Sequence, residues 1–185
     1  MTPPPDDEKG HGRGQAARQG EPPALAHAAR DTTPRRLTLS AYIRRRNGLP
    51  AGARGSLRNM LHRAFGASSF AGFWRHWNPV FGYGLGRFVH RPLLRRVPAP
   101  IALLATFVAC GALHDLVTMA ARGAPALLFT PWFLCLGTGV LLGEAAGMDL
   151  SGRPWAMRAA VHAAYLSACL AIALWGRHVL GWTGP

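Results

Sequence analysis

The chain has 185 residues, 49% of them apolar, and a formal net charge of +13. Lys9 is its single lysine, so arginine supplies nearly all of the positive charge. The length suits one modest domain, but the apolar residues gather in long runs in the second half, which is not typical of a water-soluble domain. We therefore expect an all-α integral membrane protein.

Arginine dominates the middle of the chain. Thirteen arginines and no acidic residue lie between Arg35 and Arg96. Such a block can contact nucleic acid, anionic lipid headgroups or a phosphorylated ligand. Because it runs directly into a membrane-length apolar segment and contains no nucleic-acid-binding motif, the sequence favours membrane lipid and phosphate, and predicts no nucleic-acid partner.

Residues 1–38 are rich in proline, glycine, alanine and charge. They cannot bury enough apolar surface to offset the entropy lost on ordering, so we predict a disordered tail. They also lack the apolar run of a secretory signal, and membrane insertion is expected to depend on the later segments.

Residues 39–97 are predicted to form an interfacial amphipathic and re-entrant region. A short basic helix within 37–50 would place Leu39, Tyr42 and Ile43 against lipid. A solvated basic stretch fits the same residues equally well.

A longer helix is predicted over 56–78, with Ser56 as its N-cap and an aromatic stripe at helical spacing in its second half. Pro79 has no N–H to continue the helix, so the helix should end or kink at Asn78 and leave that side-chain amide free. The stretch 80–97 carries glycines at alternate positions. We expect it to be re-entrant or interfacial rather than a phosphate-binding loop.

Residues 98–185 are predicted to form a three-helix transmembrane module. The apolar runs 98–121, 124–148 and 155–182 each supply the ~20 residues that a bilayer requires, and short links between them imply antiparallel neighbours. The arginine block before the first run places the N-terminus in the cytoplasm. The expected protein is therefore multi-pass.

Ionisable residues within these runs are candidates for function, because a titratable group in hydrocarbon is costly. His114 lies just beyond the middle of the first run, and the adjacent Asp115 points about 100° away from it, so we expect Asp115 to pair with another helix. The alternative for His114 is a neutral imidazole that hydrogen-bonds a neighbouring backbone group. Glu144, His162 and His178 are expected at the membrane interface.

The other histidines and the cysteines lack the spacing of a metal site or a disulfide framework. The histidines in the basic region have no cysteine or carboxylate near them: His62, His76 and His90. The cysteines fall one in each apolar run and should be free and buried: Cys110, Cys135 and Cys169. We predict no metal and no cofactor, and find no G-x-S-x-G motif for a serine nucleophile.

The remaining option is general-base catalysis on a hydroxyl held within the membrane. A neutral His114 would accept the proton of the hydroxyl and return it to a leaving thiolate. Asn78 would donate a hydrogen bond to the developing oxyanion or hold the acyl donor. Arginines of the basic block would hold phosphate groups of the donor, and the candidates are Arg75, Arg87 and Arg91.

Two motifs resemble a known family. Residues 73–78, Phe-Trp-Arg-His-Trp-Asn, resemble the F-Y-x-D-W-W-N motif of membrane-bound O-acyltransferases, in the branch of sterol, diacylglycerol and wax-ester acyltransferases. Residues 110–115, Cys-Gly-Ala-Leu-His-Asp, resemble the family's S-G-x-x-H-E segment. The intervening R-x-x-x-R-P-L stretch at 87–93 agrees in order.

The resemblance covers residues 56–145 and implies transfer of a fatty acyl group from acyl-CoA to a hydroxyl acceptor. It implies that His114 is the catalytic base and Asn78 the polar partner near the thioester. It also implies that Trp74 and Trp77 line the reaction chamber. Family members thread many more helices, so a chain matching their C-terminal half implies a second membrane subunit or a homo-oligomer. The alternatives are a non-catalytic membrane scaffold and a small transporter component.

Overall fold

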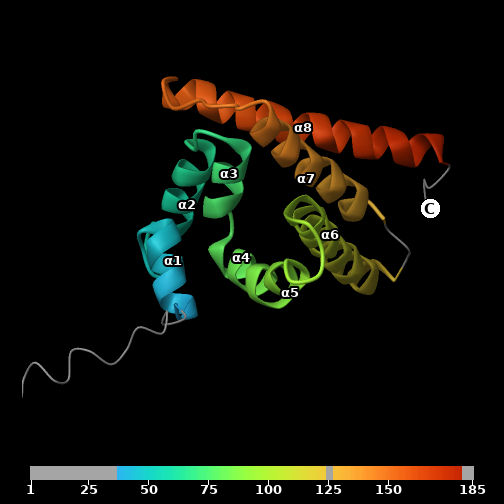
Figure 1. The fold of residues 1–185 in the computed structure, drawn as a ribbon, viewed down its shortest axis with the longest axis horizontal. Coiled ribbons are helices and arrows are strands. Elements are labelled where there is room, and N and C mark those ends of the chain that lie inside the picture. Colours follow the sequence, from blue (N-terminus) through green and yellow to red (C-terminus); the bar gives the residue numbers. More distant parts are fainter. Residues whose placement is uncertain (1–36, 124–126, 181–185) are drawn as a thin grey trace, which may run out of the picture. The chain divides into compact units, whose positions relative to one another are not determined.

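The computed structural model describes residues 37–123 and 127–180, and every regular element in them is helical. The helices are α1 (Leu39–Asn47), α2 (Ser56–Phe65), α3 (Phe70–His76), α4 (Pro79–Leu85), the π-helical turn η1 (Gly86–His90), α5 (Arg91–Leu93), α6 (Ala99–Arg122), α7 (Phe129–Ala145) and α8 (Trp155–Val179). Figure 1 shows α7 lying between α6 and α8. The predicted tail falls almost entirely outside the described residues.

Two helices have the dimensions of a membrane span. α6 has 24 residues and α8 has 25, with mean hydropathies of 1.8 and 1.6 over their most apolar windows. Only 17% and 22% of those windows are buried within the protein, so neither is the enclosed core helix of a soluble fold. Many of their apolar side chains are therefore exposed on the surface of the described residues.

The third predicted span is shorter than expected. α7 has 17 residues, or about 25 Å of helix, against the ~30 Å of a bilayer core. It ends at Ala145 because the chain turns at Gly147, which has a left-handed φ of 61°. The first residues of the predicted run, 124–126, lie outside the described residues.

The single helix predicted over 56–78 is wrong, because the chain breaks between α2 and α3. α2 ends at Phe65 with Gly66 as its C-cap, and the Ser69 hydroxyl accepts the Gly72 N–H at 3.1 Å as the N-cap of α3. The N-cap of α2 is Gly55 (φ 82°) rather than Ser56. The hydroxyl of Ser56 instead accepts a hydrogen bond from Asn47 at 2.8 Å, which joins α1 to α2.

The stretch after Pro79, predicted to be re-entrant or interfacial, is helical. Pro79 occupies the first turn of α4, where its missing N–H costs nothing, and helical structure continues through η1 and α5. α1 also differs from the interfacial prediction, since Ile43 is buried and Tyr42 is half-buried inside the protein. Leu39 is exposed, as predicted.

Asp115 joins α6 to α7, as its position beside His114 predicted. One carboxylate oxygen accepts the N–H groups of Leu128 (3.0 Å) and Phe129 (2.8 Å). The other accepts the N–H (2.8 Å) and hydroxyl (2.6 Å) of Thr130. Because the first N–H groups of a helix have no partner within it, this buried carboxylate caps α7 from the neighbouring helix.

Gly111 allows the backbones of α6 and α7 to meet one turn before Asp115. A Cβ at this position would lie 2.7 Å from the carbonyl oxygen of Phe129 and from Cα of Thr130. These are backbone atoms of α7, which cannot yield by a side-chain rotation. The two contacts together determine where α7 places its side chains against α6.

We expect Gly111→Ala to lower the melting temperature, because α6 and α7 must separate at a cost of about 1–3 kcal/mol. Gly176→Ala is the matched control: it also lies in a helix, and apart from its chain neighbours and the backbone of its own helix, no described atom would come within 4 Å of its Cβ. Helix propensity alone should stabilise the control by roughly 1 kcal/mol. Thermal unfolding in detergent measures the melting temperature of each variant. Equal shifts in the two variants would contradict the close approach of α6 to α7.

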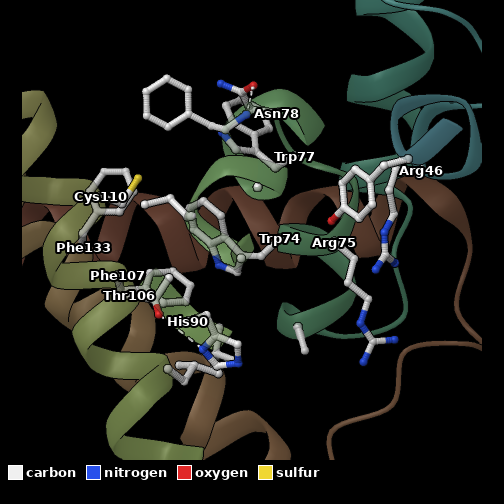
Figure 2. A pocket seen from close by; sticks show the side chains of 18 of the residues that line it. Arg46, Trp74, Arg75, Trp77, Asn78, His90, Thr106, Phe107, Cys110 and Phe133 are labelled. Carbon is white, nitrogen blue, oxygen red and sulfur yellow. Dashed lines mark hydrogen bonds between the residues drawn. The ribbon is translucent and has the colours of Figure 1, made fainter. Parts of the chain in front are cut away.

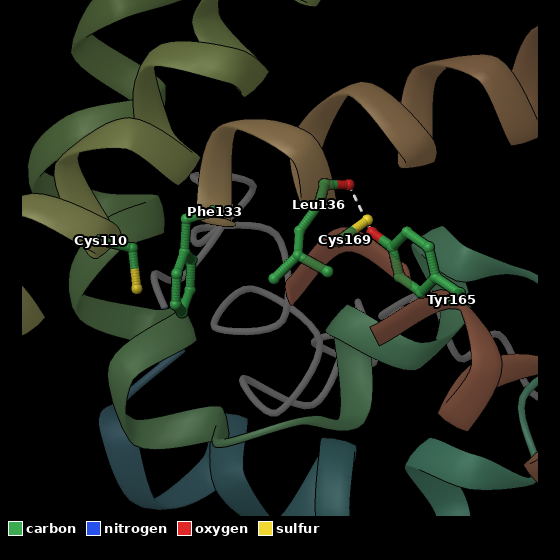
Figure 3. Packing of buried hydrophobic residues seen from close by; sticks show 5 residues of the cluster. All are labelled: Cys110, Phe133, Leu136, Tyr165 and Cys169. Atoms are coloured by element: carbon green, nitrogen blue, oxygen red, sulfur yellow. Dashed lines mark hydrogen bonds between the residues drawn. The ribbon is translucent and has the colours of Figure 1, made fainter. Parts of the chain in front are cut away.

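A cluster of buried side chains holds α6, α7 and α8 together (Figure 3): Cys110, Phe133, Leu136, Tyr165 and Cys169. The Tyr165 hydroxyl donates to the carbonyl of Leu136, so its one polar atom is paired. All three cysteines are free, as predicted, and Cys110 and Cys169 are buried while Cys135 is half-buried.

His162 is not interfacial, contrary to the prediction. It is fully buried where α8 crosses the α2–α3 turn, between the rings of Phe70 and Phe73. Its Nε2–H donates to the carbonyl of Ala67 at 3.0 Å, and Nδ1 has no partner among the described residues. His178, at the other end of α8, is exposed.

Candidate functional site

A cavity of about 460 Å³ lies among α1, α3, α4, η1, α6 and α7. This volume is within the usual range for a small-molecule site. Figure 2 shows Arg46 and Arg75 on one side of Trp74, and Cys110 and Phe133 on the other. The cavity is therefore cationic at one end and aromatic towards α6 and α7.

His114 lines this cavity from α6 and is half-buried. Its Nδ1 lies 2.8 Å from the carbonyl oxygen of Cys110, one turn earlier. Because a carbonyl only accepts, Nδ1 carries the proton of the neutral ring and Nε2 carries the lone pair. No described residue hydrogen-bonds Nε2. The backbone contact proposed as the alternative for His114 thus exists, and it leaves the second nitrogen available as a base.

Aromatic rings fix the plane of the imidazole. The Phe133 ring stacks on it with centroids 5.2 Å apart and an interplanar angle of 27°. Phe129 (5.4 Å) and Phe81 (5.7 Å) pack against it at steeper angles. Phe129 and Phe133 stand on α7, so the helix that Asp115 caps also orients His114.

Asn78 lines the cavity from the junction of α3 and α4. Its backbone is left-handed (φ 37°), and its side-chain oxygen accepts the Phe81 N–H at 3.3 Å as the N-cap of α4. The prediction that this side-chain amide is free is therefore only partly correct, because Oδ1 is engaged. Nδ2 remains as a donor on the same cavity as His114.

The two tryptophans of the aromatic stripe also line the cavity. The Trp74 ring meets Phe107 edge to face at 5.1 Å, and its Nε1–H donates to the Tyr165 hydroxyl at 3.4 Å. Trp77 stacks on the buried Phe73 at 5.4 Å. Both rings are held by packing and present a fixed apolar wall.

The three arginines predicted to bind the donor do not lie together. Arg75 lines the cavity, whereas Arg87 and Arg91 are exposed and are not among its lining residues. Arg87 instead donates to the Tyr83 hydroxyl at 3.1 Å. Arg46 takes their place in the cavity, because α1 packs back against α4.

Sequence reasoning missed several lining residues. His90, at the end of η1, has Nδ1 3.3 Å from the Thr106 hydroxyl of α6. Glu144 reaches the cavity from α7 while remaining exposed. The run of arginines ending at Arg46 was a signal for the cationic end, but no pattern in the sequence indicated His90 or Thr106. The described residues contain no group of three or more metal-ligating side chains.

Comparison with known proteins adds no assignment. No family model, no curated protein and no solved structure matches this chain. The described structure therefore defines an all-helical protein with two helices long and apolar enough to cross a membrane.

Proposed function

We propose that this protein is a membrane O-acyltransferase that transfers a fatty acyl group from acyl-CoA to a hydroxyl acceptor. The observation that carries the proposal is the state of His114: Nδ1 is held by the Cys110 carbonyl, and Nε2 is unpartnered among the described residues of an aromatic cavity. A base of this kind can act only on a group that enters the cavity. The resemblance of residues 73–78 and 110–115 to acyltransferase motifs supports the same reaction.

The positions of these residues support the following reaction. Nε2 of His114 takes the acceptor hydroxyl proton as the oxygen attacks the thioester carbonyl, and a C–O bond forms. Nδ2 of Asn78 donates to the developing oxyanion. The C–S bond then breaks, and the imidazolium returns the proton to the leaving thiolate. The Cys110 carbonyl stabilises the imidazolium while it exists, because it accepts the Nδ1–H.

The two ends of the cavity suit the two parts of the donor. Arg46 and Arg75 can pair with phosphate oxygens at the cationic end. The acyl chain then lies against Trp74 and Phe107, towards Phe133. Arg87 and Arg91, outside the cavity, would contact lipid headgroups instead.

The protein is a multi-pass membrane protein in this proposal. The exposed apolar surfaces of α6 and α8 support insertion, since lipid would cover them. α7 is the return crossing, and its shorter length is accommodated by an upright helix or local bilayer thinning. The arginine block before α6 faces the cytoplasm and places the N-terminus there. A second subunit or copy completes the chamber, with α6 offering the exposed Leu116 and Val117.

The direct test is an acyl-transfer assay with the purified full chain in nanodiscs. Radiolabelled long-chain acyl-CoA is supplied with sterol, diacylglycerol or a fatty alcohol, and lipid esters and free CoA thiol are measured together. We expect ester and thiol in equal amounts with at least one acceptor. Retention of acyl-CoA without ester or thiol from any acceptor would contradict the proposal and support the alternative, a non-catalytic lipid-binding subunit.

Asn78→Asp should separate the two roles of this residue. Aspartate keeps an oxygen to cap α4 and tolerates the left-handed backbone, but it removes the Nδ2 donor. We expect normal abundance and melting temperature, with kcat lowered about 10²–10³-fold. Asn78→Gly, which keeps the backbone conformation and removes the whole side chain, should lose both activity and some stability. Full activity in the aspartate variant would reduce Asn78 to a helix cap.

A further inference from the structure

A second hollow, of about 480 Å³, lies between α2 and the first residue of α8. It is distinct from the first cavity, because the two share no lining residue. The six residues that line it are Leu57, Arg58, Leu61, His62, Phe65 and Trp155. Four of these are apolar, two are basic and none is acidic.

Specific contacts between α2 and α8 hold the wall of this hollow in place. The Trp155 Nε1–H donates to the His62 carbonyl at 3.0 Å, and its ring stacks on the His62 ring at 5.2 Å and 11°. Arg158 donates to the Gly66 carbonyl at 2.6 Å. A Cβ on Gly66 would lie 2.7 Å from the Trp155 ring, so only glycine permits this approach. The start of α8 is thereby clamped to the end of α2.

The contact between α2 and the start of α8 sets the level of the hollow in the membrane. Trp155 is the first residue of α8, so if α8 crosses the membrane as proposed above, the hollow lies at the interface between headgroups and hydrocarbon. Tryptophan is favoured at this level. Leu57 is 66% exposed and Trp155 42% exposed, which leaves apolar surface uncovered beside a cation. The exposed surface that lines the hollow is apolar, which suits an acyl chain, and a phosphate on the same molecule would meet the charge of Arg58 beside the hollow.

We propose that this hollow is a binding site for one anionic phospholipid. Its acyl chain lies along Leu57 and Leu61 towards Trp155, and its phosphate pairs with the guanidinium of Arg58. The absence of acidic residues throughout 35–96 leaves nothing in that segment to compete for Arg58. The same charge argues against a second copy of the chain as occupant, because a symmetric contact would bring two basic surfaces together.

The test uses the full chain in a neutral detergent, titrated with phosphatidylglycerol or with phosphatidylcholine of the same acyl chains. Native mass spectrometry counts the lipids bound to each protein molecule. We expect one phosphatidylglycerol to bind more tightly than phosphatidylcholine. Arg58→Gln should weaken phosphatidylglycerol binding about tenfold and leave phosphatidylcholine binding unchanged.

Arg45→Gln is the matched control, because it removes the same charge from an exposed position on α1 outside the hollow. It should leave the first phosphatidylglycerol bound as in the wild type. Leu57→Ser should weaken both lipids, since it acts on the acyl chain. Equal losses in the two arginine variants, or equal affinity of the wild type for the two lipids, would overturn the proposal. A failure of acyl transfer would not, because lipid binding is measured separately.

Discussion

We expect His114→Gln to lower kcat for acyl transfer by about 10²–10⁴-fold, the usual contribution of a positioned general base. Glutamine keeps an N–H donor and a similar reach, but its amide has no basic nitrogen to accept the hydroxyl proton. Substrate binding should change little, because the arginines and tryptophans of the cavity are untouched. Steady-state kinetics in nanodiscs measures kcat and KM separately.

The matched control is His178→Gln, which removes an exposed imidazole from the end of α8. It should leave kcat and KM at wild-type values. The His114 variant should also fold normally, because its hydrogen bond to Cys110 lies within one helix and contributes only about 1 kcal/mol. A His114→Gln protein that is folded, inserted and fully active would remove the base from the mechanism.

We expect Asp115→Ala to lower the free energy of unfolding by about 3 kcal/mol or more. The substitution leaves three backbone N–H groups and one hydroxyl of α7 without their acceptor, in a buried position. Each unpaired buried donor costs roughly 1–3 kcal/mol, although partial fraying of the helix start relieves some of that cost. Thermal unfolding in detergent should show a large fall in melting temperature.

Activity should fall with this stability loss, because Phe129 and Phe133 on α7 hold the ring of His114. Asp149→Ala is the control carboxylate. Asp149 accepts the N–H (2.9 Å) and hydroxyl (2.8 Å) of Ser151 in an exposed turn, and these bonds hold the pKa of Asp149 below its ordinary value. Because water replaces its partners, its removal should change the melting temperature only slightly. Similar shifts in the two variants would show that Asp115 is not the cap of α7.

The candidate site was only partly predictable. The sequence indicates Asn78 as a polar residue at a broken helix end and His114 as an imidazole in an apolar run, and the structure places both on one cavity. Arg87 and Arg91 share the basic block with Arg75, yet they lie on η1 and α5 outside the cavity. Charge alone could not distinguish among thirteen arginines.

The sequence by itself determined the features that depend on local chemistry. The length and apolarity of α6 and α8, the break at Asn78, and the need of Asp115 for a partner all follow from residues close together in the chain. The tertiary structure determined which other residues those features contact. It capped α7 with Asp115, buried His162 beneath the α2–α3 turn and brought Arg46 into the cavity. These contacts join residues distant in sequence, and no periodicity encodes them, because they arise only when the helices pack.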